Sequence, residues 1–491
     1  MNMKYVIGID QSTQGTKALL FDGQARLIAR TDKAHRQKIS PEGYISHDPE
    51  EIYSNTVEVV LRLLKENGLT AQSVAGIGIS NQRETTAAWN RETGKPVCDA
   101  VVWQCARGAE VCGDFTEEQK KRIADSTGIP LSPYFPASKM KWILKNCPEA
   151  EKLAEQGKLC LGTVDSWLLF CMTGGKVFKT DYSNASRTQL FNLHTLSWDE
   201  EICGMFGVPV EALPQVCDSD SLFAVTDLGG VLDRSLPVHS VLGDSHGALF
   251  GQGCHEKGGV KATYGTGSSL MMNIGRSFQA SSHGLVTSLA WGMNGEVTYV
   301  LEGNLNYTGA VITWLQENLG LTGSPGETEE LALAANQQDA VFLVPAFSGL
   351  GAPYWKSEAR ALICGMDRNT GRNEIVRAGL DCIAYQITDV LKAMEQDSGA
   401  KLEKLCVDGG PTRNRYLMQF QSDMAQICVA VPDAEELSGI GVAYLAGISL
   451  GVYEKDKIFG NLHYEEYRPF MTAEECARRY NGWLEAVRRT V

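Results

Sequence analysis

The sequence predicts an α/β protein that is built from two related halves. Its 491 residues are more than a single hydrophobic core usually holds, so two large domains are the natural division. An apolar strand, a small polar turn and a second strand occur at residues 5–22, and the same order recurs at residues 258–273. We therefore expect a duplicated domain, with residues 1–250 as the N-terminal half and residues 251–491 as the C-terminal half.

The first hairpin has the composition of a phosphate site. Asp10 ends the first strand, and the turn at residues 11–16 is small and hydroxyl-rich, with Thr13, Gln14 and Gly15 at its centre. Backbone N–H groups and hydroxyls of such a turn can cradle phosphates. A carboxylate beside them can hold hydrated Mg²⁺. An ordinary hairpin with a solvated acidic end is the alternative explanation of this segment taken alone.

The second hairpin favours the phosphate explanation. Its turn at residues 265–269 has the sequence Gly-Thr-Gly-Ser-Ser and again lies between two apolar strands. Two phosphate-type turns about half a chain apart suggest a nucleotide bound between the halves. This organisation is typical of the actin-like class, to which sugar kinases and chaperone ATPases belong.

A strand at residues 74–80 leads into Arg83 and Glu84. Arginine donates and a carboxylate accepts hydrogen bonds, so this pair could hold a diol from both sides. A surface ion pair is the alternative. Further along, Trp103 could cover an apolar face of the same ligand, or it could be a tryptophan of the core.

Asp244 follows an apolar strand at a glycine-rich turn that opens a helix. A carboxylate at such a turn is well placed as a general base near a phosphate donor. Aspartate is also a favoured N-cap residue, so a helix cap is the alternative.

A turn in the C-terminal half suits the binding of a flat base. The strand at residues 405–408 is followed by a tight turn of two glycines, of which Gly410 is the second, and these allow close approach to the backbone. Asn414, at the start of the next helix, could border or hydrogen-bond an adenine. This end of the strand is therefore the predicted adenosine site.

Other elements are predicted from apolar spacing and turn residues. Asp48 and Pro49 provide a cap and a first helical position for a helix that continues to Leu64. A strand is expected at residues 341–345, and a polar turn at residues 180–187. Further helices are expected within residues 133–144, 162–169, 309–319, 374–394 and 439–447.

Composition excludes several classes of function. The net charge of −14 argues against a nucleic-acid-binding surface. No apolar run approaches the roughly 18 residues of a membrane span, and the N-terminus leads directly into a strand, so neither a membrane span nor a signal peptide is expected. The fourteen cysteines are scattered without a CxxC pair. We expect reduced thiols in a cytoplasmic protein rather than disulfides or zinc.

Taken together, these segments resemble the FGGY family of carbohydrate kinases over nearly the whole chain, and most of all the glycerol kinases within it. Residues 134–142 fit the first family signature. Residues 361–381 fit the second, except that Gly379 stands where Thr or Ala is usual. Other segments similar to glycerol kinases are residues 81–84, 103–105, 180–187, 348–355 and 407–410.

The resemblance implies two actin-like (ribonuclease H-like) ATPase domains with a deep interdomain cleft. The implied activity is ATP-dependent phosphorylation of a terminal hydroxyl of glycerol or of a related longer polyol or sugar, in a homodimer or homotetramer. Asp244 would be the general base, and Asp10 would serve Mg²⁺. The remaining implied roles are polyol binding by Arg83, Glu84, Trp103 and Tyr134, phosphate binding by Thr13, Gln14, Gly15, Thr266 and Gly309, and adenosine binding by Gly410 and Asn414.

Three departures from the pattern of glycerol kinases matter. Ser245 stands where Gln usually follows the catalytic Asp, and Ser269 stands where Phe is usual. Both positions contact substrate in the family, so a larger and more polar pocket is implied. In the first hairpin, Gln14, Gly15 and Lys17 replace the usual Thr-Ser and Arg; Lys17 keeps the charge of a phosphate ligand but loses the bidentate fork.

Two other functions are compatible with the same fold. A ketopentose kinase, similar to xylulokinases, would usually carry Met-His in place of Arg83 and Glu84. A non-catalytic nucleotide-binding protein would be expected to lack Asp244. Because the pair and the carboxylate are both present, phosphorylation of a polyol is the favoured hypothesis.

Overall fold

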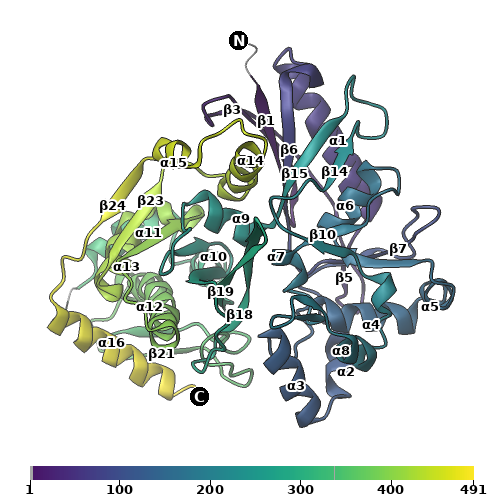
Figure 1. The fold of residues 1–491 in the computed structure, drawn as a ribbon. Helices are drawn as coiled ribbons and strands as arrows, with labels where there is room; N and C mark the ends of the chain where they lie inside the picture. Colours follow the sequence, from purple (N-terminus) through teal and green to yellow (C-terminus); the bar gives the residue numbers. More distant parts are fainter. Residues whose placement is uncertain (1–3, 337) are drawn as a thin grey trace.

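The computed structural model describes residues 4–336 and 338–491 and consists of two α/β halves (Figure 1). In the view of Figure 1 the first half, purple to blue, lies on the right, and the second half, green to yellow, lies on the left. Among the residues that the structure describes, no helix is both long and apolar enough for a membrane crossing.

A six-stranded sheet forms the centre of the first half, in the order β14-β15-β6-β1-β2-β3. Strand β1 (Tyr5–Gln11) pairs antiparallel with β2 (Gly15–Phe21) and parallel with β6 (Val74–Asn81). Strands β1 and β6 are buried almost throughout, which explains their continuous apolar sequence. The other strands of this sheet are β3 (Leu27–Ala34), β14 (Ala224–Thr226) and β15 (Leu236–Gly243).

The second half repeats this pairing in a seven-stranded sheet, in the order β18-β19-β17-β16-β22-β23-β24. Strand β16 (Val260–Tyr264) pairs antiparallel with β17 (Ser268–Gly275) and parallel with β22 (Lys404–Asp408). The strand–turn–strand repeat expected from the sequence is therefore present in both sheets. The other strands are β18 (Val286–Met293), β19 (Glu296–Leu305), β23 (Cys428–Pro432) and β24 (Tyr464–Tyr467).

Two helices join the halves near the centre of Figure 1. Helix α9 (Asp244–Gly251) follows β15, and α14 (Leu437–Ser449), from the C-terminal part of the chain, packs against α9 and across β6, β1 and β15. One sheet ends at Gly243 and the next begins at Val260, but α14 lies on the first sheet. The predicted division between residues 250 and 251 stays a prediction.

The longest predicted helices form with slightly wider bounds. Helix α1 (Pro49–Glu66) begins after Asp48, whose carboxylate accepts from the N–H of Glu50, and α12 (Arg372–Ser398) is largely buried. The remaining α-helices are α2 (Ala109–Gly113), α3 (Glu117–Thr127), α4 (Pro136–Asn146), α5 (Pro148–Glu155), α6 (Val164–Met172), α7 (Tyr182–Ala185), α8 (Glu200–Phe206), α10 (Gly309–Glu317), α11 (Glu327–Ala334), α13 (Arg415–Ala425), α15 (Lys455–Ile458) and α16 (Ala473–Arg488).

A second sheet of the first half, in the order β4-β5-β8-β7-β9, is absent from the sequence-based prediction. Its strands are β4 (Gln37–Ile39), β5 (Ile45–His47), β7 (Thr86–Asn90), β8 (Ala100–Val101) and β9 (Leu159–Thr163). The remaining strands form two-stranded sheets: β10 (Lys179–Asp181) with β13 (Gln215–Cys217), β11 (Phe191–Asn192) with β12 (Ser197–Trp198), and β20 (Phe342–Val344) with β21 (Leu362–Cys364).

The segment expected as a polar turn at residues 180–187 contains β10 and the short helix α7. The carboxylate of Asp181 accepts from the N–H groups of Ser183 and Asn184, both at 2.9 Å, and so caps α7. The polar sequence of this segment therefore includes a buried helix cap.

Candidate active site

Three predicted site residues follow neighbouring parallel strands of the first sheet. Asp10 lies near the end of β1, Arg83 follows β6, and Asp244 follows β15. Because the carboxyl ends of parallel strands meet at the same edge of a sheet, these side chains come together. Arg83 Nε donates to Asp244 Oδ1 at 3.1 Å. The side chain of Arg83 is only 5% exposed, whereas that of Asp244 is 36% exposed and so accessible to a ligand.

The structure gives Asp244 a role other than a helix cap. It is the first residue of α9, whose N-cap position is occupied by Gly243. Its carboxylate contacts Arg83 and accepts from the N–H of Ser245 at 2.6 Å. A partly exposed carboxylate oriented by a buried arginine is suited to accept a proton from a bound hydroxyl.

Asp10 lies in surroundings that suit a cation. Its Oδ1 accepts from Ser80 Oγ at 3.0 Å, and its Oδ2 lies 3.7 Å from Lys17 Nζ. Burial raises the pKa of Asp10 to about 6; Lys17 opposes this, and Asp244 adds to it. Within residues 4–336 and 338–491 no group of three or more His, Cys, Asp or Glu side chains could hold a metal ion. A Mg²⁺ ion completed by water and phosphate oxygens needs only one or two carboxylates, so Asp10 fits that ion.

Arg83 and Glu84 are both buried, so they are not a surface ion pair. Arg83 Nε lies 4.0 Å from Glu84 Oε1, and Arg187 Nε donates to the same oxygen at 2.6 Å. Glu84 has a backbone φ of 59°, in the left-handed region that side chains other than glycine rarely adopt. Such strained residues cluster at functional sites, where the surrounding structure holds them in place.

Trp103 and Tyr134 form an aromatic wall beside the first hairpin. The indole N–H of Trp103 donates to Thr13 Oγ1 at 2.9 Å, and the Trp103 ring meets the ring of Tyr134 edge-on at 5.5 Å. Trp103 is half-buried rather than part of the core. The wall is supported by Lys139, whose Nζ donates to the carbonyl oxygen of Tyr134 and whose pKa burial lowers to about 7.

Ser245 and Ser269 meet across the two halves. Arg83 Nη2 donates to Ser245 Oγ at 3.3 Å, and Ser245 Oγ donates to Ser269 Oγ at 3.4 Å. Ser245 belongs to α9, and Ser269 belongs to β17 of the second sheet. Ser245 and Ser269, which both depart from the family pattern, therefore place their hydroxyls together beside Arg83.

The turn of the second hairpin is closed against the start of α10. The N–H of Thr308 donates to the carbonyl of Thr266 at 3.0 Å, and the N–H of Gly309 donates to the carbonyl of Gly265 at 2.9 Å. A Cβ on Gly309 would lie 2.5 Å from that same carbonyl oxygen, so glycine is required there. The first N–H groups of α10 thus hold the turn in place, and the roles of Thr266 and Gly309 toward phosphate stay predictions.

Two predicted nucleotide ligands have protein partners in the structure. Lys17 Nζ donates to Glu436 Oε2 at 2.7 Å. Asn414 caps α13, because its Oδ1 accepts from the N–H of Leu417 at 2.9 Å while its Nδ2 donates to Thr328 Oγ1 at 3.1 Å. The roles of Lys17 and Asn414 toward ATP stay predictions, as do those of Gln14 and Gly15 in the first hairpin. The role of Gly410 also stays a prediction; a Cβ added to Gly410 would meet no atom within 4 Å.

Four charged residues near the predicted site are absent from the sequence-based prediction. They are Lys139, Arg187, Glu302 and Glu436. Glu302 follows Val300 and Leu301 within a buried strand, and a charged residue in such a strand rarely lacks a partner. A charged residue within an apolar strand could therefore have indicated that Glu302 has buried partners. The sequence does not show that these partners are Arg83 and Arg187.

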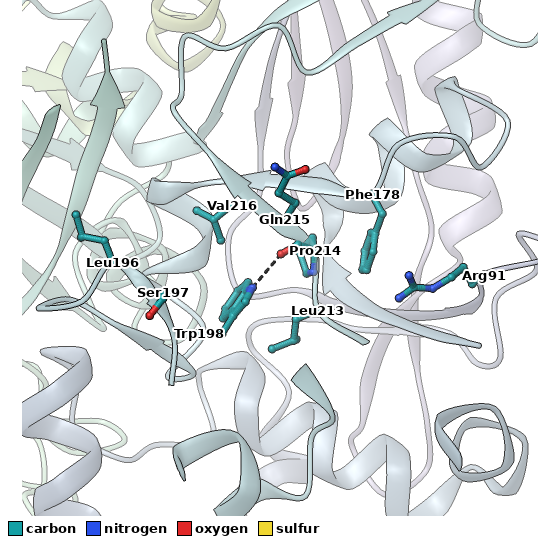
Figure 2. Close-up of a pocket in the computed structure, with 9 residues that line it drawn as sticks. All are labelled: Arg91, Phe178, Leu196, Ser197, Trp198, Leu213, Pro214, Gln215 and Val216. Carbon is teal, nitrogen blue, oxygen red and sulfur yellow. Dashed lines mark hydrogen bonds between the residues drawn. The ribbon is translucent and has the colours of Figure 1, made fainter. Parts of the chain in front are cut away.

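A surface pocket of about 520 Å³ lies apart from these residues (Figure 2). The Trp198 indole N–H donates to the carbonyl of Pro214 at 2.9 Å, and the Arg91 guanidinium lies 5.4 Å from the centre of the Phe178 ring. None of the predicted site residues lines this pocket.

Comparison with known proteins identifies the family. Residues 5–251 match the N-terminal domain, and residues 260–450 the C-terminal domain, of the FGGY family of carbohydrate kinases. Glycerol kinase 1 of Thermotoga maritima is 46% identical, and glycerol kinase of Fusobacterium nucleatum is 44% identical; each alignment covers 99% of this chain and 99% of the relative.

Solved structures agree with this result. The crystal structure of Plasmodium falciparum glycerol kinase with ADP matches with a TM-score of 0.94 and 33% identity, covering 100% of this chain and 98% of that one. Xylulose kinase of Lactobacillus acidophilus shares the fold, with a TM-score of 0.88 and 20% identity over 99% of this chain and 98% of that one. The predicted actin-like fold class is confirmed, and the chain belongs to the FGGY family of carbohydrate kinases.

Proposed function

We propose that this protein transfers the γ-phosphoryl group of ATP to a terminal hydroxyl of glycerol, or of a longer polyol with a glycerol-like end. The similarity to glycerol kinases along the whole chain supports an ATP:glycerol phosphotransferase. The observation that carries the proposal is the contact between Arg83 and Asp244, because it brings the arginine predicted to bind a diol next to the predicted general base.

The residues of this site have complementary roles in the proposed reaction. Arg83 and Glu84 bind adjacent hydroxyls of the acceptor, and the aromatic wall of Trp103 and Tyr134 covers its carbon atoms. Asp244 accepts the proton of the reacting hydroxyl as the oxygen attacks the γ-phosphorus. The bond between that phosphorus and the oxygen bridging to the β-phosphate breaks, and ADP leaves.

ATP would lie along the two hairpin turns. The N–H groups and hydroxyls of both turns would contact its phosphates, with Thr13 and Thr266 at their centres. Asp10 would hold Mg²⁺, which supplies positive charge that offsets the charge of the phosphates. Gly410 and Asn414 would border the adenosine. The assembly into a homodimer or homotetramer is a separate prediction that light scattering tests.

The hydrogen bond between Ser245 and Ser269 supports a second, finer proposal about the acceptor. Two small hydroxyl side chains stand beside Arg83, where the family pattern has a longer amide and an aromatic ring. They can also pair with hydroxyls of a ligand longer than glycerol. A four- or five-carbon polyol or sugar with a glycerol-like end is therefore a candidate substrate.

A screen of acceptors tests both proposals. ADP release with MgATP would be measured against glycerol, tetritols, pentitols and ketopentoses. Phosphorylation of at least one polyol is expected, with little ADP release in the absence of acceptor. Activity with ketopentoses alone would favour a xylulokinase-like enzyme, and release of ADP that is independent of every acceptor would contradict the proposed kinase.

A further inference from the structure

We propose that Glu302 is a positioning residue that orients the acceptor site from the second half of the molecule. The inference rests on the proposed phosphorylation of a polyol. Glu302 lies on β19, and its side chain is 0% exposed. Its Oε2 accepts from Arg83 Nη1 at 2.9 Å and lies 3.1 Å from Arg187 Nη1. Two arginines of the first half thus converge on one oxygen of the second half.

Each of these arginines also contacts an acidic residue of the proposed site. Arg83 Nε donates to Asp244, and Arg187 Nε donates to Glu84. Because a guanidinium group is planar and rigid, holding its Nη1 on Glu302 also sets the direction of its Nε. Glu302 therefore governs the orientation of both Asp244 and Glu84 without contacting the acceptor itself.

The orientation of the Glu302 carboxylate is itself fixed. Its Oε1 accepts from Asn304 Nδ2 at 3.0 Å, so both oxygens have partners. Asn304 pairs in register with Ser269 of β17, the strand that contributes the second half's hydroxyl to the site. Glu302, which binds the two arginines, and Ser269, which contributes a hydroxyl to the site, are consequently held by neighbouring strands of one sheet.

Charge explains why a carboxylate is needed at this position. Burial alone would raise the pKa of Glu302, but Arg187 and Arg83 outweigh burial and hold this pKa well below its ordinary value. The residue is thus an anion between two buried cations. Without this charge, Arg83 and Arg187 would keep Asp244 and Glu84 as acidic partners but would lose the anion that holds them from the second half, and a buried cation that loses its partner tends to move toward the carboxylate that remains.

Another buried carboxylate of the second half provides a contrast. Asp397 on α12 has a side chain that is 1% exposed, and its oxygens accept from Ser281 and Ser282 and contact His283. All of these partners belong to the second half. Asp397→Asn is therefore a matched control for the loss of a buried carboxylate charge outside the proposed site.

The experiment compares Glu302→Gln, which keeps the shape of the side chain and removes its charge, with Asp397→Asn. Steady-state kinetics would give KM for the acceptor and KM for MgATP, with the best acceptor of the wild type as the probe, and melting temperatures would report stability. For Glu302→Gln we expect a higher acceptor KM and a kcat/KM for the acceptor that is lower by about 100-fold, the usual effect of a misplacement near 1 Å. The KM for MgATP should stay the same. Asp397→Asn should change the melting temperature and leave the ratio of the two KM values unchanged.

A second variant keeps the test decisive if Glu302→Gln does not fold. Arg187→Lys retains the charge but loses the fork that joins Glu302 to Glu84, so the acceptor KM should again rise selectively. A parallel rise of both KM values in Glu302→Gln would contradict the proposal. If only Arg187→Lys folds, a wild-type acceptor KM in that variant would contradict it as well. A failure of the proposed function is distinguishable, because it would appear as a wild type that phosphorylates no polyol.

Discussion

Gly441 of α14 lies against Gly247 of α9 so closely that a Cβ on Gly441 would be 1.9 Å from the carbonyl oxygen of Gly247. Gly247 is three residues after Asp244, so this contact sits within one helical turn of the proposed base. The crossing of α9 and α14 thus depends on glycine at position 441. A similar close approach occurs between β1 and α14, where a Cβ added to Gly8 would lie 2.6 Å from the carbonyl oxygen of Gly439.

Gly441→Ala should destabilise the protein and impair catalysis, because the new methyl group cannot fit without moving a helix. Overpacking of this kind typically costs about 1–3 kcal/mol. Thermal unfolding and kcat would be measured together. Gly204→Ala in α8 is the matched control, since its added Cβ meets no atom within 4 Å and alanine favours a helix. Equal melting temperatures for the two variants would contradict the tight crossing.

Asp244→Asn should lower kcat by about 10²–10⁴-fold, the usual effect of losing a general base. Asparagine keeps an oxygen that can accept from Arg83 Nε but cannot take up the proton of the hydroxyl. Binding of ATP, measured by calorimetry, should stay close to that of the wild type, and so should the melting temperature. Turnover near the wild-type rate would remove Asp244 from the role of base.

Asp10→Asn should raise the Mg²⁺ concentration needed for half-maximal activity, because a neutral amide is a weaker ligand of a hard cation. The measurement is a Mg²⁺ titration of ADP release at a fixed ATP concentration. Asp32→Asn is the control, since Asp32 is an exposed carboxylate on strand β3 of the same sheet. Superimposable titrations of wild type and Asp10→Asn would show that Asp10 does not serve the metal.

The double substitution Ser245→Gln with Ser269→Phe should shift substrate preference toward glycerol. It fills the space beside Arg83 and removes two hydroxyls that could pair with a longer acceptor. The loss or gain of one methylene-sized contact changes discrimination by about 10–200-fold. The ratio of kcat/KM for glycerol to that for the best longer polyol would be compared in both proteins. A wild type that already prefers glycerol to every tetritol, pentitol and ketose would contradict the enlarged pocket.

Lys139→Met should stabilise the protein near pH 7, and the gain should shrink as the pH rises. Burial lowers the pKa of Lys139 to about 7 from the ordinary 10.5, although Glu84 opposes the shift. Between these two values the unfolded chain binds more protons than the folded protein, so wild-type stability rises with pH by up to about 1.4 kcal/mol per pH unit. Below pH 7 the penalty of the buried charge is fully present.

Melting temperatures of wild type and Lys139→Met at pH 7, 8 and 9 would test this dependence on pH. Lys145→Met, which replaces an exposed lysine of the same helix, is the control. A difference between wild type and Lys139→Met that stays constant over this range would contradict the lowered pKa.

Local sequence determined the strands, the two hairpin turns and the side chains that follow the strands. The runs that end near Asp10 and before Asp244 are apolar because parallel strands are buried on both faces, and this pattern is visible without any partner. The same reasoning predicted that Arg83 follows a strand, and adjacency of parallel strands brought it to Asp244. The family resemblance added Tyr134 and Gly309, which no local pattern requires, whereas the glycine pair after a strand had already suggested Gly410 and Asn414 as adenosine residues.

Tertiary structure alone decided which charges of the two halves meet. Arg83 and Glu302 are 219 positions apart in the chain, and Lys17 and Glu436 are 419 apart. The five-stranded sheet of the first half escaped prediction for the same reason, since its short strands are stabilised by each other rather than by their own periodicity. Such contacts depend on how the two sheets are joined through α9 and α14. The attraction between the two charges of a pair becomes strong only when this packing has removed both of them from water.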